Sequence, residues 1–118
     1  MNKVKKHFNI CKQVAESGES ADGYRRYRLG SVGLRSDGAI ARASNICTRK
    51  PNRLAHAEAR CIKKLDYGST IFVVRIGRDG SLQQARPCKA CRKLMEQRGI
   101  ARCYYSIGER EYGILEFS

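Results

Sequence analysis

Residues able to bind a metal ion or move a proton gather in two short stretches of the chain. His56 and Glu58 stand two apart in LAHAEARC, and Cys88 and Cys91 stand three apart in RPCKACRKLM. One imidazole and two thiolates match the three ligands of a catalytic zinc site, which keeps its fourth position open for water. A nearby carboxylate can take a proton from a water that zinc has made more acidic. We therefore predict that His56, Cys88 and Cys91 bind one Zn²⁺ per chain and that Glu58 is the proton carrier.

Each stretch alone also has a simpler interpretation. His56 and Glu58 could belong to an ordinary surface helix. Two cysteines at i and i+3 share one helix face, and they could form a redox pair at a helix start or be two buried side chains. The stretches together favour zinc, because each is predicted to open a helix and both helices are predicted on the same side of a sheet.

The elements that must hold these residues follow from hydrophobic periodicity and turn signals. A helix is predicted over 3–16, where apolar residues recur at helical spacing, and Asp37-Gly38 marks a hairpin turn. The run TIFVVRIG predicts a central strand buried on both faces. The full prediction is helices over about 3–16, 54–66 and 87–99 and strands over about 25–35, 39–44, 70–77, 101–107 and 112–118. Gly30 and Gly33 are predicted to mark a bulge in the first strand, and Gly68 to cap the second helix.

The two stretches together resemble a known signature. HAE at 56–58 and PCKAC at 87–91 are similar to the H-x-E…P-C-x-x-C motif of the zinc-dependent nucleobase deaminases. The order of elements is similar to the cytidine-deaminase-like fold along nearly the whole chain. This resemblance implies one α/β domain, residues 1–118, with three layers. It also implies a five-stranded mixed sheet with helices packed on it and the last two strands antiparallel.

The resemblance also implies an activity and further site residues. The activity is hydrolytic, zinc-dependent deamination of a base. In the family an alanine between ligand and acid donates its N–H to the base carbonyl, and Ala57 matches that position. Asn45 resembles an asparagine that bonds the sugar and base, although it could instead cap the strand as a turn-former. Tyr104 or Tyr105 could wall the base pocket, or one could pack in the core while the other faces solvent.

The charge balance points to a polyanionic partner. Lys and Arg number 24 against 11 Asp and Glu, so the net charge is +13. Such an excess favours DNA, RNA or an anionic surface, the alternative being a solvated basic surface with no specific ligand. No apolar run reaches the length that spans a bilayer and no signal peptide is recognisable. We therefore expect a cytoplasmic protein with no membrane partner.

Many of the basic residues fall on segments around the predicted pocket. They could hold the phosphates that flank a base in the site, or they could be spread around the sheet without forming a stripe. The candidate nucleic-acid contacts are Arg25, Arg26, Arg49, Lys50, Arg53, Arg86, Lys89 and Arg92. Arg28 and Lys93 extend the same two groups.

The first hypothesis for function is deamination of cytosine to uracil in single-stranded nucleic acid, with DNA favoured over RNA. A histidine ligand combined with a terminal strand hairpin resembles the small polynucleotide cytosine deaminase groups. The alternatives are a deaminase of free cytidine, deoxycytidine or their nucleotides, an adenine deaminase acting on RNA, and a nucleic-acid-binding protein that retains the fold without catalysis. An intact Glu58 argues against the last of these.

The remaining cysteines and the second histidine are assigned no chemistry. Cys11, Cys47, Cys61 and Cys103 are predicted to be small buried apolar residues, because without a secretory signal a disulfide framework is not expected. His7 lies on a basic helix and is predicted to be exposed.

Overall fold

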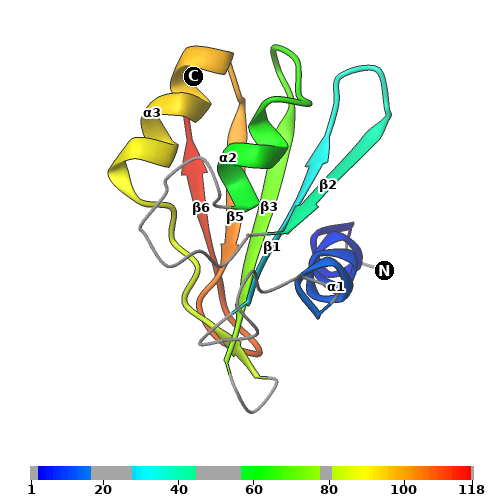
Figure 1. Ribbon diagram of the computed structural model, residues 1–118, viewed down its shortest axis with the longest axis vertical. Coiled ribbons are helices and arrows are strands. Elements are labelled where there is room, and N and C mark those ends of the chain that lie inside the picture. The colour runs from blue at the N-terminus through cyan, green and yellow to red at the C-terminus, as the bar shows by residue number, and fades with distance from the viewer. Residues whose placement is uncertain (1–2, 17–27, 45–56, 78–80, 118) are drawn as a thin grey trace, which may run out of the picture.

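A mixed sheet forms the middle layer of the protein. The computed structural model describes residues 3–16, 28–44, 57–77 and 81–117, and the structural statements below concern these residues. Helices and strands follow one another in the predicted order, with one additional short strand (Figure 1). The helices are α1 (Lys3–Glu16), α2 (Ala57–Ile62) and α3 (Lys89–Arg98), and the strands are β1 (Arg28–Leu34), β2 (Ile40–Ser44), β3 (Thr70–Ile76), β4 (Leu82–Gln83), β5 (Arg102–Ser106) and β6 (Tyr112–Glu116).

The strand order confirms the predicted mixed sheet, which has six strands where five were predicted. It runs β2-β1-β3-β5-β6, with β4 paired only to the end of β3. The pairing of β3 with β5 is parallel, and every other pairing is antiparallel, including the predicted hairpin of β5 and β6. The sequence prediction missed β4, because a strand of two residues shows no periodicity to detect.

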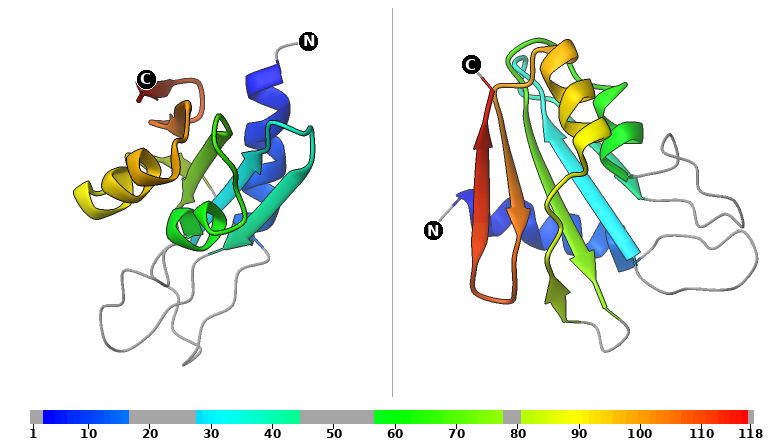
Figure 2. Two further views of the ribbon diagram at one scale, coloured as in Figure 1. Left: turned by 90° about the horizontal axis from the view of Figure 1, so that it is seen from above. Right: turned by 90° about the vertical axis from the view of Figure 1, so that its left-hand side faces the viewer.

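The helices cover the two faces of the sheet unequally. Helix α1 packs on one face, and α2 and α3 lie together on the other (Figure 2). The face under α1 buries Phe8, Cys11 and Val74, whereas the opposite face buries Leu65 and Met95. Strand β3 contributes to both cores, as its continuous apolar sequence predicts. Among the described helices, none has the length and apolar character needed to cross a membrane.

The two glycines of β1 are points of close approach, and the predicted bulge is wrong. Strand β1 keeps an unbroken register with both of its neighbours. A Cβ on Gly30 would collide with the carbonyl oxygen of Cys11 and would come within 2.7 Å of the Ala15 nitrogen. A Cβ on Gly33 would collide with Leu65 from the other face. The absent side chains therefore let α1 and the segment after α2 pack directly against β1.

The helix boundaries confirm α1 and correct the other two. Helix α2 ends at Ile62, so Gly68, with φ of 84°, shapes the turn before β3 and does not cap the helix. Helix α3 begins at Lys89 after its N-cap Cys88, so Pro87 precedes the cap and is not in the first turn. Gly99 closes α3 in a left-handed conformation with φ of 80°.

His7 is buried, contrary to prediction. Its ring stacks on Phe72 with centroids 4.7 Å apart, and only 8% of the residue is exposed. The helical pattern places Val4, Phe8 and Cys11 on the inner face, and His7 precedes Phe8 at the edge of that face. The long side chain of Phe72, projecting from the sheet, reaches this edge and gives His7 an aromatic partner.

Polar contacts tie the loops together at the end of the sheet where β3 begins. Asp66 accepts hydrogen bonds from the hydroxyls of Ser36 and Ser69, and these hydrogen bonds hold the pKa of the Asp66 carboxyl well below its usual range. Arg98, the last residue of α3, donates its Nε–H to the carbonyl of Leu65 at 2.8 Å and a terminal N–H to that of Lys63 at 3.0 Å. The end of α3 is therefore bonded to the chain that follows α2.

We predict that Gly30→Ala destabilises the protein and that Gly108→Ala does not. The new Cβ at position 30 must displace the backbone of α1, and overpacking of this kind costs about 1–3 kcal/mol. Position 108 has open space around its Cβ direction, so the same substitution there should change stability by less than about 1 kcal/mol. Urea denaturation of both variants measures the difference. Equal stability of the two variants would show that α1 does not pack on Gly30.

Candidate active site

The N-terminal ends of α2 and α3 point to the same end of the sheet. The loops that follow the two helices meet, because the Gly68 N–H donates to the Gly99 carbonyl at 2.8 Å and the Ala101 N–H to the Ser69 carbonyl at 2.9 Å. The parallel strands β3 and β5 start from these loops and run to the opposite end. The first residues of both helices therefore lie toward the end where β3 and β5 finish, as Figure 1 shows. In open α/β sheets this is the usual end for a ligand site.

Cys88 and Cys91 form one side of the candidate site. Cys88 caps α3 in an extended conformation and is exposed, and its carbonyl accepts the Arg92 N–H at 3.0 Å. Cys91 lies in the first turn of the helix and is fully buried. The backbone N–H groups of a first helical turn favour the anionic thiolate, which is the form that binds zinc. The donor types and their position at the start of a helix therefore fit half of a zinc site.

The other predicted ligand lies outside the described residues. His56 directly precedes Ala57, the first residue of α2, and Glu58 is the second residue of that helix. The structure describes the backbone of Ala57 and Glu58 but not the side chain of Glu58. Over 3–16, 28–44, 57–77 and 81–117, no three His, Cys, Asp or Glu side chains converge on a possible metal position. The ligand set His56, Cys88 and Cys91 stays a prediction.

Several other predicted contacts also lie outside the described residues. These are Asn45 in the predicted pocket, Cys47 among the predicted buried cysteines, and Arg25, Arg26, Arg49, Lys50 and Arg53 among the predicted phosphate contacts.

Ser106 anchors the segment that leads to the cysteine pair, and sequence analysis did not identify it. Its hydroxyl donates to the Gln83 carbonyl at 2.7 Å and accepts the Arg75 N–H at 3.4 Å, and its carbonyl accepts the Ala85 N–H at 2.8 Å. Only 1% of Ser106 is exposed. A buried serine at the end of a strand is a weak sequence signal, since its role appears only when β3, β4 and β5 converge.

The two predicted pocket tyrosines lie on opposite faces of the sheet. Tyr105 lies on the face that α2 and α3 cover and is 7% exposed, with its ring over Gly113. Tyr104 lies on the α1 face, where it stacks on Phe72 with centroids 5.0 Å apart. Adjacent strand residues alternate between faces, so only one of the two can share a face with Cys91. That residue is Tyr105.

The other described cysteines confirm the prediction of buried apolar residues. Cys11, Cys61 and Cys103 are fully buried and form no disulfide. Burial raises the pKa of the Cys11 thiol well above its ordinary value, so the group stays protonated, and it donates to the Phe72 carbonyl at 3.3 Å.

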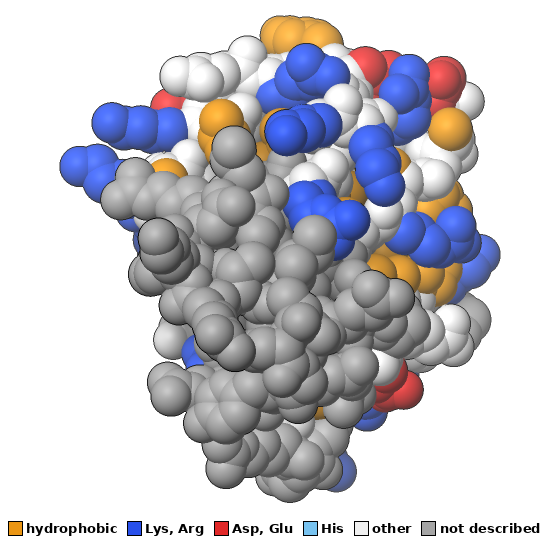
Figure 3. All heavy atoms as spheres, in the orientation of Figure 1, with side chains coloured by type: hydrophobic (Ala, Val, Ile, Leu, Met, Phe, Trp, Pro, Cys, Tyr) orange, Lys and Arg blue, Asp and Glu red, His pale blue; other side chains and the backbone are white. Residues whose placement is uncertain are grey.

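Basic side chains surround the start of α3. Arg86, Lys89 and Lys93 are exposed, and Arg92 is half-buried. Figure 3 shows many Lys and Arg side chains, and fewer acidic ones, over the described part of the face that α2 and α3 cover. The charged residues next to Cys88 in the chain are therefore basic, in line with the net charge of +13.

Comparisons with known proteins agree with this arrangement. Residues 1–107 match the model of a family described as the cytidine and deoxycytidylate deaminase zinc-binding region. A solved cytidine deaminase from Burkholderia pseudomallei is similar, with a TM-score of 0.72 and 17% identity over 99% of this chain and 94% of that one. A cytidine deaminase from Mycobacterium leprae has a TM-score of 0.66 and 15% identity over 99% of this chain and 95% of that one. A cytidine deaminase from Mycobacterium tuberculosis has a TM-score of 0.57 and 17% identity over 93% of this chain and 91% of that one. A search of curated protein sequences gave no significant match.

We predict that Ser106→Ala weakens zinc binding whereas Ser69→Ala does not. Both substitutions remove a buried hydroxyl and its hydrogen bonds, but only Ser106 holds the segment before Cys88. Loss of groups that orient a metal site lowers metal affinity by roughly tenfold or more. Competition with a colorimetric zinc chelator measures the affinity, and thermal denaturation checks that both variants fold. The anchoring role is refuted if the two variants bind zinc equally well.

Proposed function

The chain belongs to the cytidine and deoxycytidylate deaminase family, and so it is a hydrolase that removes an amine by breaking a C–N bond. From this premise we propose that it converts cytosine to uracil in single-stranded nucleic acid, with DNA favoured over RNA. The observation that carries the choice of a polymer is the group of exposed basic residues around Cys88.

The family match implies zinc, and the proposed ligands are His56, Cys88 and Cys91, holding one ion per chain. When bound, zinc supplies a Lewis acid that lowers the pKa of a water molecule toward neutrality. Two thiolates and a neutral imidazole leave the site with little net charge, so the water remains a weaker acid than at an all-histidine site. A carboxylate that accepts the proton is therefore needed.

Glu58 is proposed to move the protons of the reaction. Its carboxylate takes a proton from the attacking water and delivers it to N3 of the base, while the water oxygen bonds to C4. A second proton passes from the new C4 hydroxyl through Glu58 to the exocyclic amine. The C4–N4 bond then breaks, ammonia leaves, and the C4 oxygen becomes the carbonyl of uracil.

The remaining proposed residues orient the base. Ala57, at the start of α2, offers its backbone N–H to the base carbonyl, and such a group has no partner within its own helix. Asn45 bonds the sugar and base. Tyr105, on the face that α2 and α3 cover, is the tyrosine proposed to wall the pocket, and Tyr104 on the other face is not.

Charge supports a polymeric substrate. A free nucleotide presents phosphate at one position, whereas basic residues precede Cys88 and continue along α3 through Lys89 and Lys93. Phosphates on either side of a target base would each gain a cationic partner in such a surface. We therefore propose Arg86, Lys89 and Arg92 as contacts for the flanking strand, together with Arg25, Arg26, Arg49, Lys50 and Arg53.

A second candidate is deamination of cytidine, deoxycytidine or their monophosphates. It is favoured by the similarity of the whole fold to three proteins named as cytidine deaminases and by the family description, which includes deoxycytidylate. Both candidates share the same chemistry at C4 and differ only in what surrounds the base.

We predict that Glu58→Ala abolishes turnover while zinc content is unchanged. Loss of a general acid and base costs about 10²–10⁴ in rate, and Glu58 is proposed to act in both roles. Glu96→Ala is the matched control, because Glu96 is an exposed carboxylate on α3. Turnover is measured by the loss of cytosine, and metal content by mass spectrometry. Full activity of the Glu58 variant would rule out the proposed proton transfer.

We predict that a cytosine-containing single-stranded oligonucleotide is converted with a higher kcat/KM than cytidine or deoxycytidylate. Phosphate contacts add binding energy to the polymer alone, and raising salt should therefore slow the polymer reaction more than the nucleoside reaction. Sequencing of a mixed-sequence oligonucleotide reports the base and its context. Equal or faster turnover of the free compounds would favour the second candidate.

A further inference from the structure

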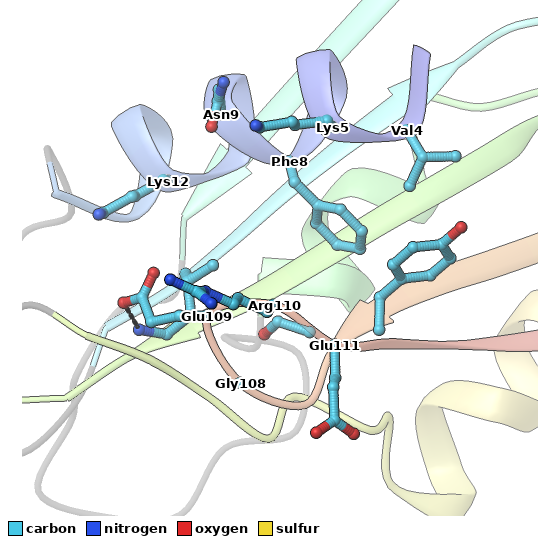
Figure 4. Close-up of a pocket in the computed structure, with 12 residues that line it drawn as sticks. Val4, Lys5, Phe8, Asn9, Lys12, Gly108, Glu109, Arg110 and Glu111 are labelled. Atoms are coloured by element: carbon cyan, nitrogen blue, oxygen red, sulfur yellow. Dashed lines mark hydrogen bonds between the residues drawn. The ribbon is translucent and has the colours of Figure 1, made fainter. Parts of the chain in front are cut away.

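A groove lies on the face of the sheet opposite to α2 and α3. It has a volume of about 520 Å³ and runs between α1 and the turn that joins β5 to β6. Val4, Lys5, Phe8, Asn9 and Lys12 line it from the helix, and Figure 4 shows these residues above the hairpin. From the sheet and hairpin it is lined by Leu82, Ser106, Gly108, Glu109, Arg110, Glu111 and Tyr112. The proposed catalytic residues do not use this groove.

An exposed aromatic ring that packs against two other rings lines the groove. Tyr112 is 43% exposed, although its ring contacts Phe8 at 5.7 Å and Tyr104 at 5.9 Å between centroids. Tyr104 in turn stacks on Phe72. Ile114, two residues along the same face of edge strand β6, is 47% exposed. Tyr112 therefore presents an aromatic surface to solvent while it packs against Phe8 and Tyr104, and apolar surface continues beside it at Ile114.

Cationic side chains outnumber acidic ones along the groove. Lys5 and Lys12 stand seven residues apart on one side of α1, and Arg110 lies on the facing turn. Of the two acids on that turn, Glu109 accepts the backbone N–H of Leu82 at 2.7 Å. In Figure 4 the carboxylate of Glu111 points away from α1. The groove is therefore lined by three cations and two acids, and one of the acids, Glu109, is hydrogen-bonded to the backbone of Leu82.

We propose that this groove binds single-stranded nucleic acid, with a base stacked on Tyr112 and phosphates on Lys5, Lys12 and Arg110. Aromatic rings beside cationic side chains are the usual elements of such surfaces, since every base has a face to stack and every linkage a negative charge. The inference deepens the proposed function and rests on its polymeric substrate. A second copy of this chain is a less suitable occupant, because it would bring the three cations of its own groove toward a surface that is already basic.

The groove binds nucleotides other than the one whose base reacts. Cys88 and Cys91 belong to the α3 layer and Tyr112 to the face under α1, so the sheet separates the two sites. A nucleic-acid strand that occupies both sites must pass round an edge of the sheet. The β-strand at the edge next to the groove is β6. Long oligonucleotides should therefore gain from the groove, whereas a mononucleotide in the catalytic site should not.

The test compares groove variants with matched variants of equal charge. Lys5→Gln combined with Lys12→Gln removes two groove cations, and Lys6→Gln combined with Lys63→Gln removes two exposed cations that do not line the groove. Tyr112→Leu removes the aromatic face but keeps apolar bulk against Phe8. Binding is measured by fluorescence anisotropy over a range of salt, with a labelled oligonucleotide of about 20 nucleotides, longer than the roughly 4–16 that one such surface covers. Kinetics with cytidine and with the oligonucleotide are measured for every variant.

The expected result is a loss of affinity specific to the groove variants. Tyr112→Leu should weaken oligonucleotide binding by about fivefold or more. The groove lysine pair should lower the slope of log K against log salt by about 1.4, which is roughly 0.7 for each lost phosphate contact to a single strand. The control variant with Lys6→Gln and Lys63→Gln should bind the oligonucleotide nearly as tightly as the parent does. The kcat/KM for cytidine should be unchanged in every variant.

Other outcomes separate this inference from the proposed function. If the parent converts the oligonucleotide and the groove variants bind it as tightly as the control pair, the groove inference is wrong and the function stands. If the groove variants lose binding but the parent converts no cytosine, the function is wrong and the groove stands. Absence of oligonucleotide binding by the parent overturns the groove inference. Self-association in sedimentation that only the groove variants lose, with oligonucleotide affinity intact, would identify a second copy as the occupant and would also overturn it.

Discussion

The parallel pairing of β3 with β5 is the constraint on which the rest of the structure depends. Two parallel strands cannot be joined by a tight turn, so the chain between them must cross one face of the sheet, and α3 makes that crossing. The crossing brings the start of α3, and with it Cys88, to the end of the sheet where β3 and β5 finish. Helix α2 precedes β3 and packs beside α3, so its first residues face the same end. Bringing the cysteine helix and the glutamate helix together is therefore a consequence of strand direction.

Close packing at β1 brings the helical layers directly against the sheet. Gly30 admits the backbone of α1 on one face, and Gly33 admits Leu65 on the other. Central strand β3 contributes side chains to an apolar core on each face, and burial of this apolar surface offsets the entropy lost in ordering the strand. At the end of the sheet where β3 begins, Arg98 donates hydrogen bonds to the carbonyls of Leu65 and Lys63. At the opposite end the buried hydroxyl of Ser106 ties β3 and β5 to the segment before Cys88.

The two faces of the sheet leave different chemistry exposed. The α2 and α3 face presents Cys88 among basic side chains, whereas its other described thiols, those of Cys61, Cys91 and Cys103, are buried. The α1 face is covered only as far as the helix reaches, which leaves Tyr112 and Ile114 partly exposed on the edge strand. An excess of positive charge spread over both faces disfavours self-association and favours a long polyanion that can contact more than one of them. The proposed substrate and the proposed groove are connected by this common electrostatic cause.

The sequence by itself determined the family and the order of the main elements. The ligand types and their spacing in HAE and PCKAC identify the family without coordinates, because a metal selects its donors by type and number. Periodicity predicted α1, the doubly buried β3 and the terminal hairpin, since each is specified by contacts close along the chain or by a long apolar run.

Only the tertiary structure decided what depends on distant contacts. Gly30 and Gly33 suggested a bulge from sequence, but their purpose is the approach of α1 and Leu65, which no local pattern encodes. His7 is buried because Phe72 reaches it from the sheet, and Tyr104 and Tyr105 are assigned to opposite faces by the pleat of β5. Ser106 gains its role only where three strands converge. These features arise between residues far apart in the chain or across a layer, and one-dimensional periodicity carries no information about such pairs.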